Sequence, residues 1–158
     1  MPSRQDRFRD VAGRFATGVA VVTCDGPDGP AGLTTNAITS LSLEPPLLLV
    51  CFDNDSRTLP AVREAGCFAV NVLREGQEEL ARVFASKRVA REKFESVTHV
   101  VEHGVPVLDG AIAWLACDLR ELLPGGDHTI GIGEVTEMDA DPAGRPLLWF
   151  AGGYARLG

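Results

Sequence analysis

A run of seven small and mostly polar residues, Thr34 to Ser40, stands just before one of the most apolar stretches of the chain, Leu47–Phe52. Such a run beside a core strand is either a solvated turn or a row of hydrogen-bonding groups lining a pocket for a large, flat, polar ligand. The other segments that could carry chemistry favour the pocket. Its candidate binding residues are Thr34, Thr35, Asn36, Ala37 and Ser40.

A second polar segment, Asp53 to Thr58, directly follows the apolar stretch and precedes an expected short helix. Ser56 and Thr58 offer hydroxyls, Arg57 offers a guanidinium, and a helix start leaves main-chain N–H groups free. Together these groups predict a seat for a phosphate. Taken alone, the segment fits an ordinary helix cap with a solvated arginine somewhat better.

A third segment, Phe84–Arg88, places the hydroxyl of Ser86 beside the ammonium of Lys87, with Lys93 and Phe94 beyond. A solvated basic helix face and a ligand contact explain it equally well. The segment becomes informative only together with the other two.

The fourth segment, Gly126–Val135, contains Asp127-His128 at the expected mouth of a hairpin. A histidine there is usually an exposed turn residue. Here it has an acid beside it, and Gly131 and Gly133 follow on the strand, which favours a site. Such strand glycines indicate places where a backbone or a ligand comes close.

Composition excludes several classes of partner and site. The net charge is −7 and the pI about 4.9, which argues against nucleic acid or an anionic membrane but still permits an anionic cofactor. The four cysteines form no CxxC pair and the three histidines are scattered, so no metal site is expected. No Rossmann, Walker or GxSxG motif occurs. Without a signal peptide or a membrane-spanning apolar run, we expect a cytoplasmic protein.

The segments must be positioned by a mainly β domain. Helices are expected at 4–15, 58–65, 77–84 and 87–94, and strands at 19–24, 33–36, 47–52, 68–73, 97–102, 112–123, 129–138 and 147–151. Residues 97–102, 112–123 and 129–138 are expected to be the long strands that finish the domain, the last two joined by a hairpin turn. This order predicts a single domain over 1–158, an antiparallel β-barrel with a few covering helices rather than a βαβ array.

In order and spacing, the chain resembles the flavin reductase family with the FMN-binding split barrel, the NAD(P)H:flavin oxidoreductase components of two-component monooxygenases. The matching landmarks run nearly from end to end. They are residues 15–23, Gly32–Pro46, Phe68–Leu73, Phe84-Ala85, Gly126–Thr129, Gly133–Val135 and Gly153-Tyr154.

The resemblance implies a split antiparallel barrel that is a homodimer, binds FMN or FAD near the subunit interface, uses NADH or NADPH, and supplies reduced flavin to a partner monooxygenase. It implies that Thr34 to Ala37 surround the polar edge of the flavin and that His128 lies near the nicotinamide. The flavin-binding residues expected on this basis are Thr34, Thr35, Asn36, Ala37, Ser40, Asp53, Ser56, Arg57, Thr58, Ser86, Lys87 and Tyr154.

Two departures from the family pattern stand out. Ile38 replaces a common Phe, which could change how the ring packs, and Lys93 replaces a common Arg, which keeps the charge but loses the bidentate fork. Two other functions are compatible with the same barrel. One is a flavin- or haem-binding protein that does not oxidise NAD(P)H, and the other is a flavin oxidase acting directly on a small substrate. Gly126–Thr129 favours the reductase.

Overall fold

The structure is a computed structural model that describes residues 1–158. The helices are α1 (Arg4–Ala12), α2 (Thr58–Ala65), α3 (Glu78–Ala85) and α4 (Ala90–Glu95). The strands are β1 (Thr17–Gly18), β2 (Ala20–Gly26), β3 (Gly29–Thr35), β4 (Ile38–Leu43), β5 (Pro46–Asp53), β6 (Cys67–Val72), β7 (His99–Glu102), β8 (Val105–Leu108), β9 (Ala113–Gly125), β10 (His128–Ala140), β11 (Leu148–Phe150) and β12 (Gly153–Ala155).

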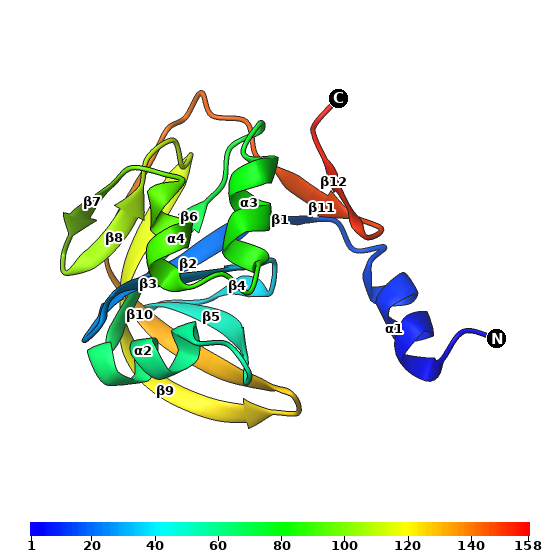
Figure 1. Ribbon diagram of the computed structural model, residues 1–158, viewed down its shortest axis with the longest axis horizontal. Coiled ribbons are helices and arrows are strands. Elements are labelled where there is room, and N and C mark those ends of the chain that lie inside the picture. The colour runs from blue at the N-terminus through cyan, green and yellow to red at the C-terminus, as the bar shows by residue number, and fades with distance from the viewer.

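A seven-stranded antiparallel sheet, in the order β3-β2-β6-β9-β10-β5-β4, forms the centre of the molecule (Figure 1). Its edge strands, β3 and β4, are consecutive in the chain and only Asn36 and Ala37 lie between them. The two edges must therefore lie close together, so the sheet curls back on itself although no ladder joins β3 to β4. The mainly β, antiparallel architecture expected from the sequence is confirmed.

The core occupies both faces of the sheet. Val22, Phe52 and Phe68 belong to one buried cluster, and Val21 and Phe84 belong to a second cluster beneath α3. Val21 and Val22 are neighbours in β2, and alternate residues of a strand point to opposite faces. β2 is therefore buried on both sides, which explains why its sequence is a continuous apolar run.

The glycines of β10 make room for aromatic side chains of the core and not for a ligand. A Cβ on Gly131 would lie 2.7 Å from the ring of Phe52, and one on Gly133 would lie 2.6 Å from the ring of Phe68. These two rings pack edge to face with centroids 6.0 Å apart. Gly131 and Gly133 are thus core positions that make room for aromatic side chains, and they give no support to a site.

One other expectation was wrong. Residues 97–102 do not form a long strand of the main sheet: β7 has four residues and pairs only with β8, which the sequence analysis missed. The strand expected at 33–36 is the end of β3, and after a two-residue corner Ile38 begins β4, a strand that was not predicted.

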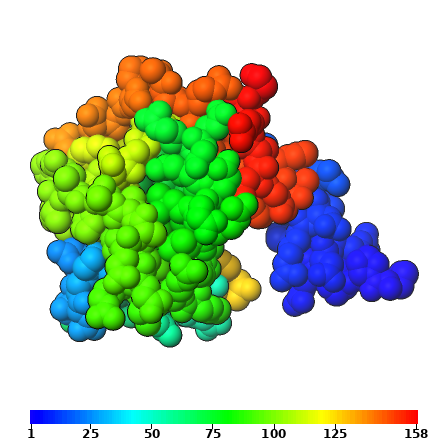
Figure 2. Space-filling model, turned by 45° about the horizontal axis from the view of Figure 1, so that its top comes forward, coloured from blue at the N-terminus to red at the C-terminus, as the bar shows by residue number.

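Helix α1 is shorter than expected and stands apart from the sheet. A capping box begins it, since Asp6 N–H donates to Ser3 Oγ at 3.0 Å and Ser3 N–H donates to Asp6 Oδ2 at 3.1 Å. The helix ends at Ala12, where Gly13 N–H caps Arg9 O at 2.8 Å. No residue of α1 is buried, and the N-terminal segment projects from the body beside the C-terminal strands (Figure 2).

All four cysteines are free thiols, as expected. Burial raises the pKa of Cys24 and of Cys117 to about 12, which leaves them in the protonated, unreactive form. None of the four helices has the length and apolar character needed to cross a membrane.

Candidate functional site

Three segments that are far apart in the sequence enclose one cavity of about 230 Å³. They are the end of β3, the loop from β5 into α2, and the stretch between α3 and α4. Of the sequence-predicted residues, the structure brings seven together in its wall: Thr34, Asp53, Ser56, Arg57, Thr58, Ser86 and Lys87.

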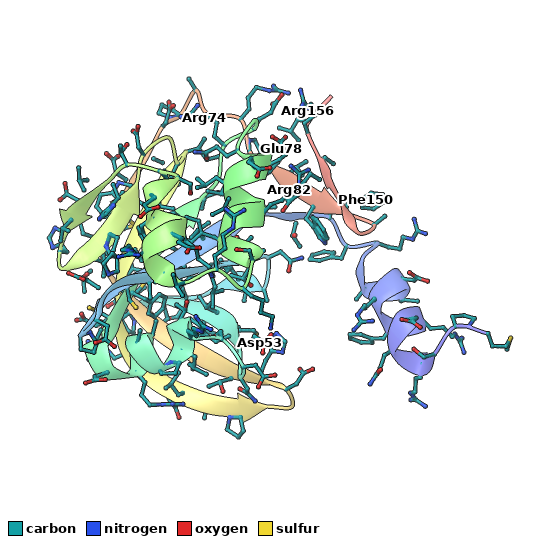
Figure 3. All side chains as sticks on the ribbon, viewed as in Figure 1. Asp53, Arg74, Glu78, Arg82, Phe150 and Arg156 are labelled. Atoms are coloured by element: carbon teal, nitrogen blue, oxygen red, sulfur yellow. The ribbon has the colours of Figure 1, made fainter.

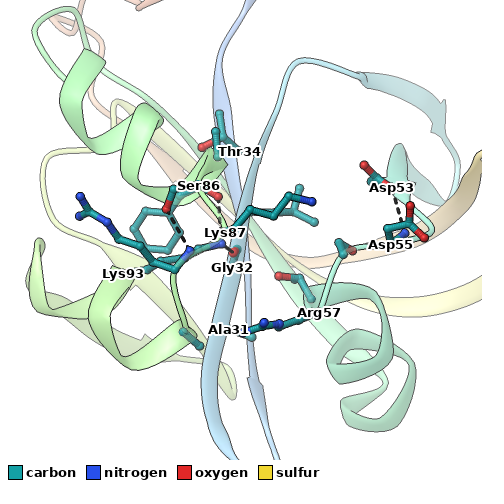
Figure 4. A pocket seen from close by; sticks show the side chains of 16 residues that line it. Ala31, Gly32, Thr34, Asp53, Asp55, Arg57, Ser86, Lys87 and Lys93 are labelled. Atoms are coloured by element: carbon teal, nitrogen blue, oxygen red, sulfur yellow. Dashed lines mark hydrogen bonds between the residues drawn. The ribbon is translucent and has the colours of Figure 1, made fainter.

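The cavity is rich in cations that lack an acidic partner. Arg57, Lys87, Arg88 and Lys93 line it, and none of the four makes a salt bridge. Arg57 and Lys93 lie on opposite sides of the strand that carries Gly32 (Figure 4). Uncompensated cations around one hollow favour an anionic ligand.

Lys93 is the most constrained of these cations. Its half-buried Nζ donates to Phe84 O at 3.1 Å and to Gly32 O at 3.3 Å, which joins α4 to α3 and β3. Burial, and then the positive charge of Arg57, lower the pKa of Lys93 below its ordinary value. A phosphate between Arg57 and Lys93 would relieve this repulsion. Sequence analysis placed Lys93 beyond the third segment and noted it as a departure from the family pattern, but did not include it among the predicted binding residues.

The loop into α2 is built as a helix start. Asp53 Oδ1 accepts from Asp55 N–H at 2.9 Å, and Ser56 Oγ accepts from Leu59 N–H at 3.2 Å. The acceptor side of Ser56 is therefore used as a cap, as the simpler sequence interpretation proposed. The Thr58 hydroxyl lines the cavity and makes no hydrogen bond within the chain, so both interpretations describe part of this loop.

Two other predicted hydroxyls are already engaged. Thr34 Oγ1 donates to Ala81 O at 2.6 Å, and Ser86 Oγ donates to Val83 O at 2.6 Å while accepting from Arg88 N–H at 3.3 Å. The hydroxyl of Thr34 therefore attaches β3 to α3, and the hydroxyl of Ser86 stabilises the C-terminal end of α3 beside the cavity. A ligand would meet their remaining lone pairs or the neighbouring main chain.

A second hollow of about 220 Å³ adjoins the first and shares Thr34 and Ala85 with it. The predicted residues Thr35, Asn36 and Tyr154 line it. Tyr154 packs edge to face on Trp149, with centroids 5.0 Å apart. This hollow offers aromatic and amide surface next to the cationic cavity, as a flat polar ligand with an anionic tail would require.

The C-terminal strand that carries Tyr154 is held against α3 by charged side chains. The guanidinium of Arg82 lies 5.2 Å from the centroid of the Tyr154 ring, and Arg156 lies 4.0 Å from Glu78 and 3.4 Å from Glu75. Figure 3 shows Arg82, Glu78 and Arg156 gathered where α3 meets β12. Sequence reasoning did not find these contacts, because they join the middle of the chain to its C-terminal segment.

Two of the predicted flavin-binding residues, Ala37 and Ser40, lie outside both hollows. Ala37 N–H is taken by Thr35 Oγ1 at 3.0 Å, and Ala37 O accepts from Cys51 N–H at 3.0 Å. Ala37 thus has no free main-chain donor for a ligand. Ser40 is an exposed residue of β4 opposite Leu48.

His128 begins β10 and pairs in register with Asp53, which lines the cationic cavity. Its Nδ1 lies 2.7 Å from Asp127 Oδ1. This hydrogen bond from the ring is the main cause that holds the pKa of the Asp127 carboxyl below its usual range. His128 itself faces a separate groove, whose other wall is the first part of α1, including Arg4 and Phe8.

Known proteins resemble this chain over nearly its whole length. The family model for the flavin reductase like domain matches residues 12–158. An NADH-dependent FAD reductase from Streptomyces globisporus is 41% identical over 160 residues, which cover 99% of this chain and 87% of that protein. The reductase component of 4-hydroxyphenylacetate 3-monooxygenase from Thermus thermophilus is 40% identical over 153 residues, 97% of each chain.

Solved structures of flavin oxidoreductases also resemble this chain over its whole length. The NADH:FAD oxidoreductase SgcE6 from Streptomyces globisporus C-1027 superposes with a TM-score of 0.93 at 39% identity, covering 100% of this chain and 96% of that one. The same oxidoreductase in complex with NAD and FAD fragments gives a TM-score of 0.91 at 40% identity with the same coverage.

Proposed function

The chain belongs to the flavin reductase like domain family, and from this premise we propose that it is an NAD(P)H:flavin oxidoreductase acting as one domain over residues 1–158. It moves a hydride from reduced nicotinamide to FMN or FAD and supplies the reduced flavin to a partner monooxygenase. The cavity of unpaired cations beside an aromatic hollow carries this proposal. Relatives named as NADH-dependent reductases and as monooxygenase reductase components support it.

The cationic cavity suits the phosphate end of a flavin. Arg57 and the free hydroxyl of Thr58 hold the phosphate from the α2 side, and Lys87 and Lys93 face it from the stretch between α3 and α4. Charged hydrogen bonds of this kind are the strong ones. Thr34, Thr35, Asn36 and Tyr154 then border the ring system in the neighbouring hollow.

When bound, the flavin supplies the redox chemistry, so the chain needs no nucleophile or metal of its own. What the protein must supply is orientation, exclusion of water and donors for developing negative charge. We expect His128 to orient the nicotinamide carboxamide, with Asp127 fixing its ring through Nδ1. Hydride transfer requires no proton acceptor at the nicotinamide carbon, so His128 acts by position.

The functional unit is a homodimer. A flat, wide cofactor needs walls on both faces, and the curled sheet of one chain offers mainly one. Phe8 and Val11 of α1 are 73% and 75% exposed, and Leu43 of β4 is 92% exposed. Large apolar side chains of this kind on one molecule support an interface with a second copy.

The deciding experiment mixes the purified protein with NADH or NADPH and excess FMN or FAD, and follows the absorbance of reduced nicotinamide. Loss of that absorbance that requires both protein and flavin is expected. If neither nucleotide is oxidised with either flavin, the reductase assignment fails and a flavin-binding role without turnover takes its place.

A further inference from the structure

Asn54, which lies outside both hollows, joins the loop that enters α2 to the hairpin that carries His128. Its main-chain N–H donates to Asp127 O at 3.1 Å, and its Nδ2 donates to Gly126 O at 3.2 Å. Its Oδ1 accepts from Thr129 Oγ1 at 2.6 Å. One residue thus bonds to the hairpin on both sides of His128.

No other residue outside this hairpin makes a side-chain hydrogen bond to it between 120 and 134. Arg120 pairs with Glu134, and Asp127 pairs with His128, but both are contacts within the hairpin. The turn residues at its tip are exposed. Beyond the β5–β10 and β9–β10 ladders, the side-chain contacts that position the tip of the hairpin around His128 therefore come from Asn54.

Asn54 also belongs to the loop of residues 53–58 that enters α2, and the other residues of this loop line the cationic cavity. Asp53 and Asp55 flank it and both line the cationic cavity. Ser56 N–H donates to Asp53 O at 3.1 Å, which closes the turn around Asn54. A ligand that fixes Arg57 and Thr58 would thus also fix Asn54.

We propose that Asn54 is a positioning residue that couples the phosphate end of the flavin to the nicotinamide site through the Asp127-His128 hairpin. The proposal rests on the proposed function. Asn54 touches neither ligand. A bound phosphate orders residues 53–58, and Asn54 passes this order on to the hairpin. His128 is therefore better positioned when FMN is bound than when riboflavin, which has no phosphate, is bound. Such coupling between two binding sites is reciprocal.

The experiment measures KM for NADH with FMN and with riboflavin in the wild-type chain and in Asn54→Ala. In the wild type we expect a lower KM for NADH with FMN. In Asn54→Ala this KM should rise roughly two- to tenfold toward the riboflavin value, the range of one or two neutral hydrogen bonds. KM with riboflavin and the affinity for FMN should change little.

Thr129→Val is the matched variant, since it removes the hydroxyl that reaches Asn54 Oδ1 while keeping the side chain's shape and the main chain. It should reproduce part of the effect, and Thr129→Ser should restore it. Thermal unfolding tests whether each variant is folded. If Asn54→Ala is not folded, the Thr129 variants serve as the test.

The two proposals fail in different ways. An equal KM for NADH with both flavins in the wild type, or an unchanged difference in the folded variants, overturns the coupling. A wild-type chain that oxidises NADH with neither flavin overturns the proposed function, and the coupling that rests on it falls with it.

Discussion

At the scale of single residues, the proposed recognition of a phosphate rests on cations that the rest of the chain leaves unpaired. Arg57 stands at the start of α2 and Lys93 stands across β3 from it, and neither has a carboxylate partner. The acids in the same wall, Asp53 and Asp55, are bonded to each other through a side chain and a main-chain N–H. Selectivity for phosphorylated flavins should therefore be set by these two cations.

Arg57→Ala should weaken FMN binding and leave riboflavin binding nearly unchanged. A hydrogen bond to a charged group contributes about 1.5–3 kcal/mol, so the affinity for FMN should fall roughly ten- to hundredfold. Flavin fluorescence quenching measures both affinities. Arg63→Ala is the control, because Arg63 belongs to the same helix but lies outside the cavity. An equal loss for riboflavin and FMN would place Arg57 elsewhere.

The ratio of the affinity for FMN to the affinity for riboflavin should fall with rising pH. This fall should occur at a lower pH than the deprotonation of an ordinary lysine would produce. Lys93 is cationic below its pKa, and burial and Arg57 lower that pKa. Deprotonation removes the charge that faces the phosphate, so the FMN advantage should shrink by roughly tenfold as the pH passes the lowered value.

The measurement titrates both flavins over a pH series, with riboflavin correcting for ionisation of the ring itself. Lys93→Met should start with a smaller FMN advantage and lack this transition. If the wild type keeps its full advantage up to the ordinary lysine range, the phosphate does not lie near Lys93.

At the scale of elements, local signals fixed some boundaries and tertiary packing fixed the rest. Helix α2 was predicted at 58–65 because Gly66 follows it, and Gly66 does end it in the left-handed conformation, at φ 72°. The long β9–β10 hairpin was expected from apolar runs joined by a turn of glycines. These cues act over a few residues and are visible in sequence.

The missed elements depend on distant partners. β8 is buried among residues of the sheet and is paired only with the short β7, so its four residues carry no recognisable pattern. β4 mixes three hydroxyl residues with Ile38, Leu41 and Leu43 and is largely exposed at the sheet edge, so its sequence has no clear buried face. The candidate site follows the same division: its cationic segments were predicted, but the role of Asn54 could not be, since its partners lie more than 70 residues away.

The glycines of β10 provide a prediction at this scale. In Gly133→Ala, the new Cβ would lie 2.6 Å from the Phe68 ring and 2.8 Å from Cys117 Cβ. Overpacking of this kind costs about 1–3 kcal/mol, which chemical denaturation should show as a lower free energy of unfolding. Gly18→Ala is the matched control, because nothing lies within 4 Å of a Cβ there. Equal stability of the two variants would contradict the packing argument.

At the scale of the whole molecule, charge and apolar surface are distributed unevenly. The chain carries a net charge of −7, yet four cations without a salt-bridge partner, Arg57, Lys87, Arg88 and Lys93, line one cavity. Several exposed large apolar side chains lie in the N-terminal segment, where Phe15, 81% exposed, follows Phe8 and Val11 of α1. Gly13 O accepts from Ala151 N–H at 2.9 Å and so ties the end of α1 to the β11–β12 hairpin. The C-terminal end of α1 is thus attached to the body of the protein, while the apolar face of the helix is left uncovered.

We expect this face to be covered in a homodimer, and Phe8→Ser combined with Val11→Ser to dissociate it. Full burial of each side chain is worth about 1.5–3 kcal/mol, so the pair should weaken association by roughly two to four orders of magnitude. Sedimentation equilibrium measures the change, and Arg14→Ser, at an exposed polar position just beyond α1, should leave the dimer intact. Because the proposed second wall of the flavin site comes from the partner copy, the double variant should also bind flavin more weakly at low protein concentration. A wild-type chain that sediments as a monomer while binding flavin tightly would show instead that one chain completes the site alone.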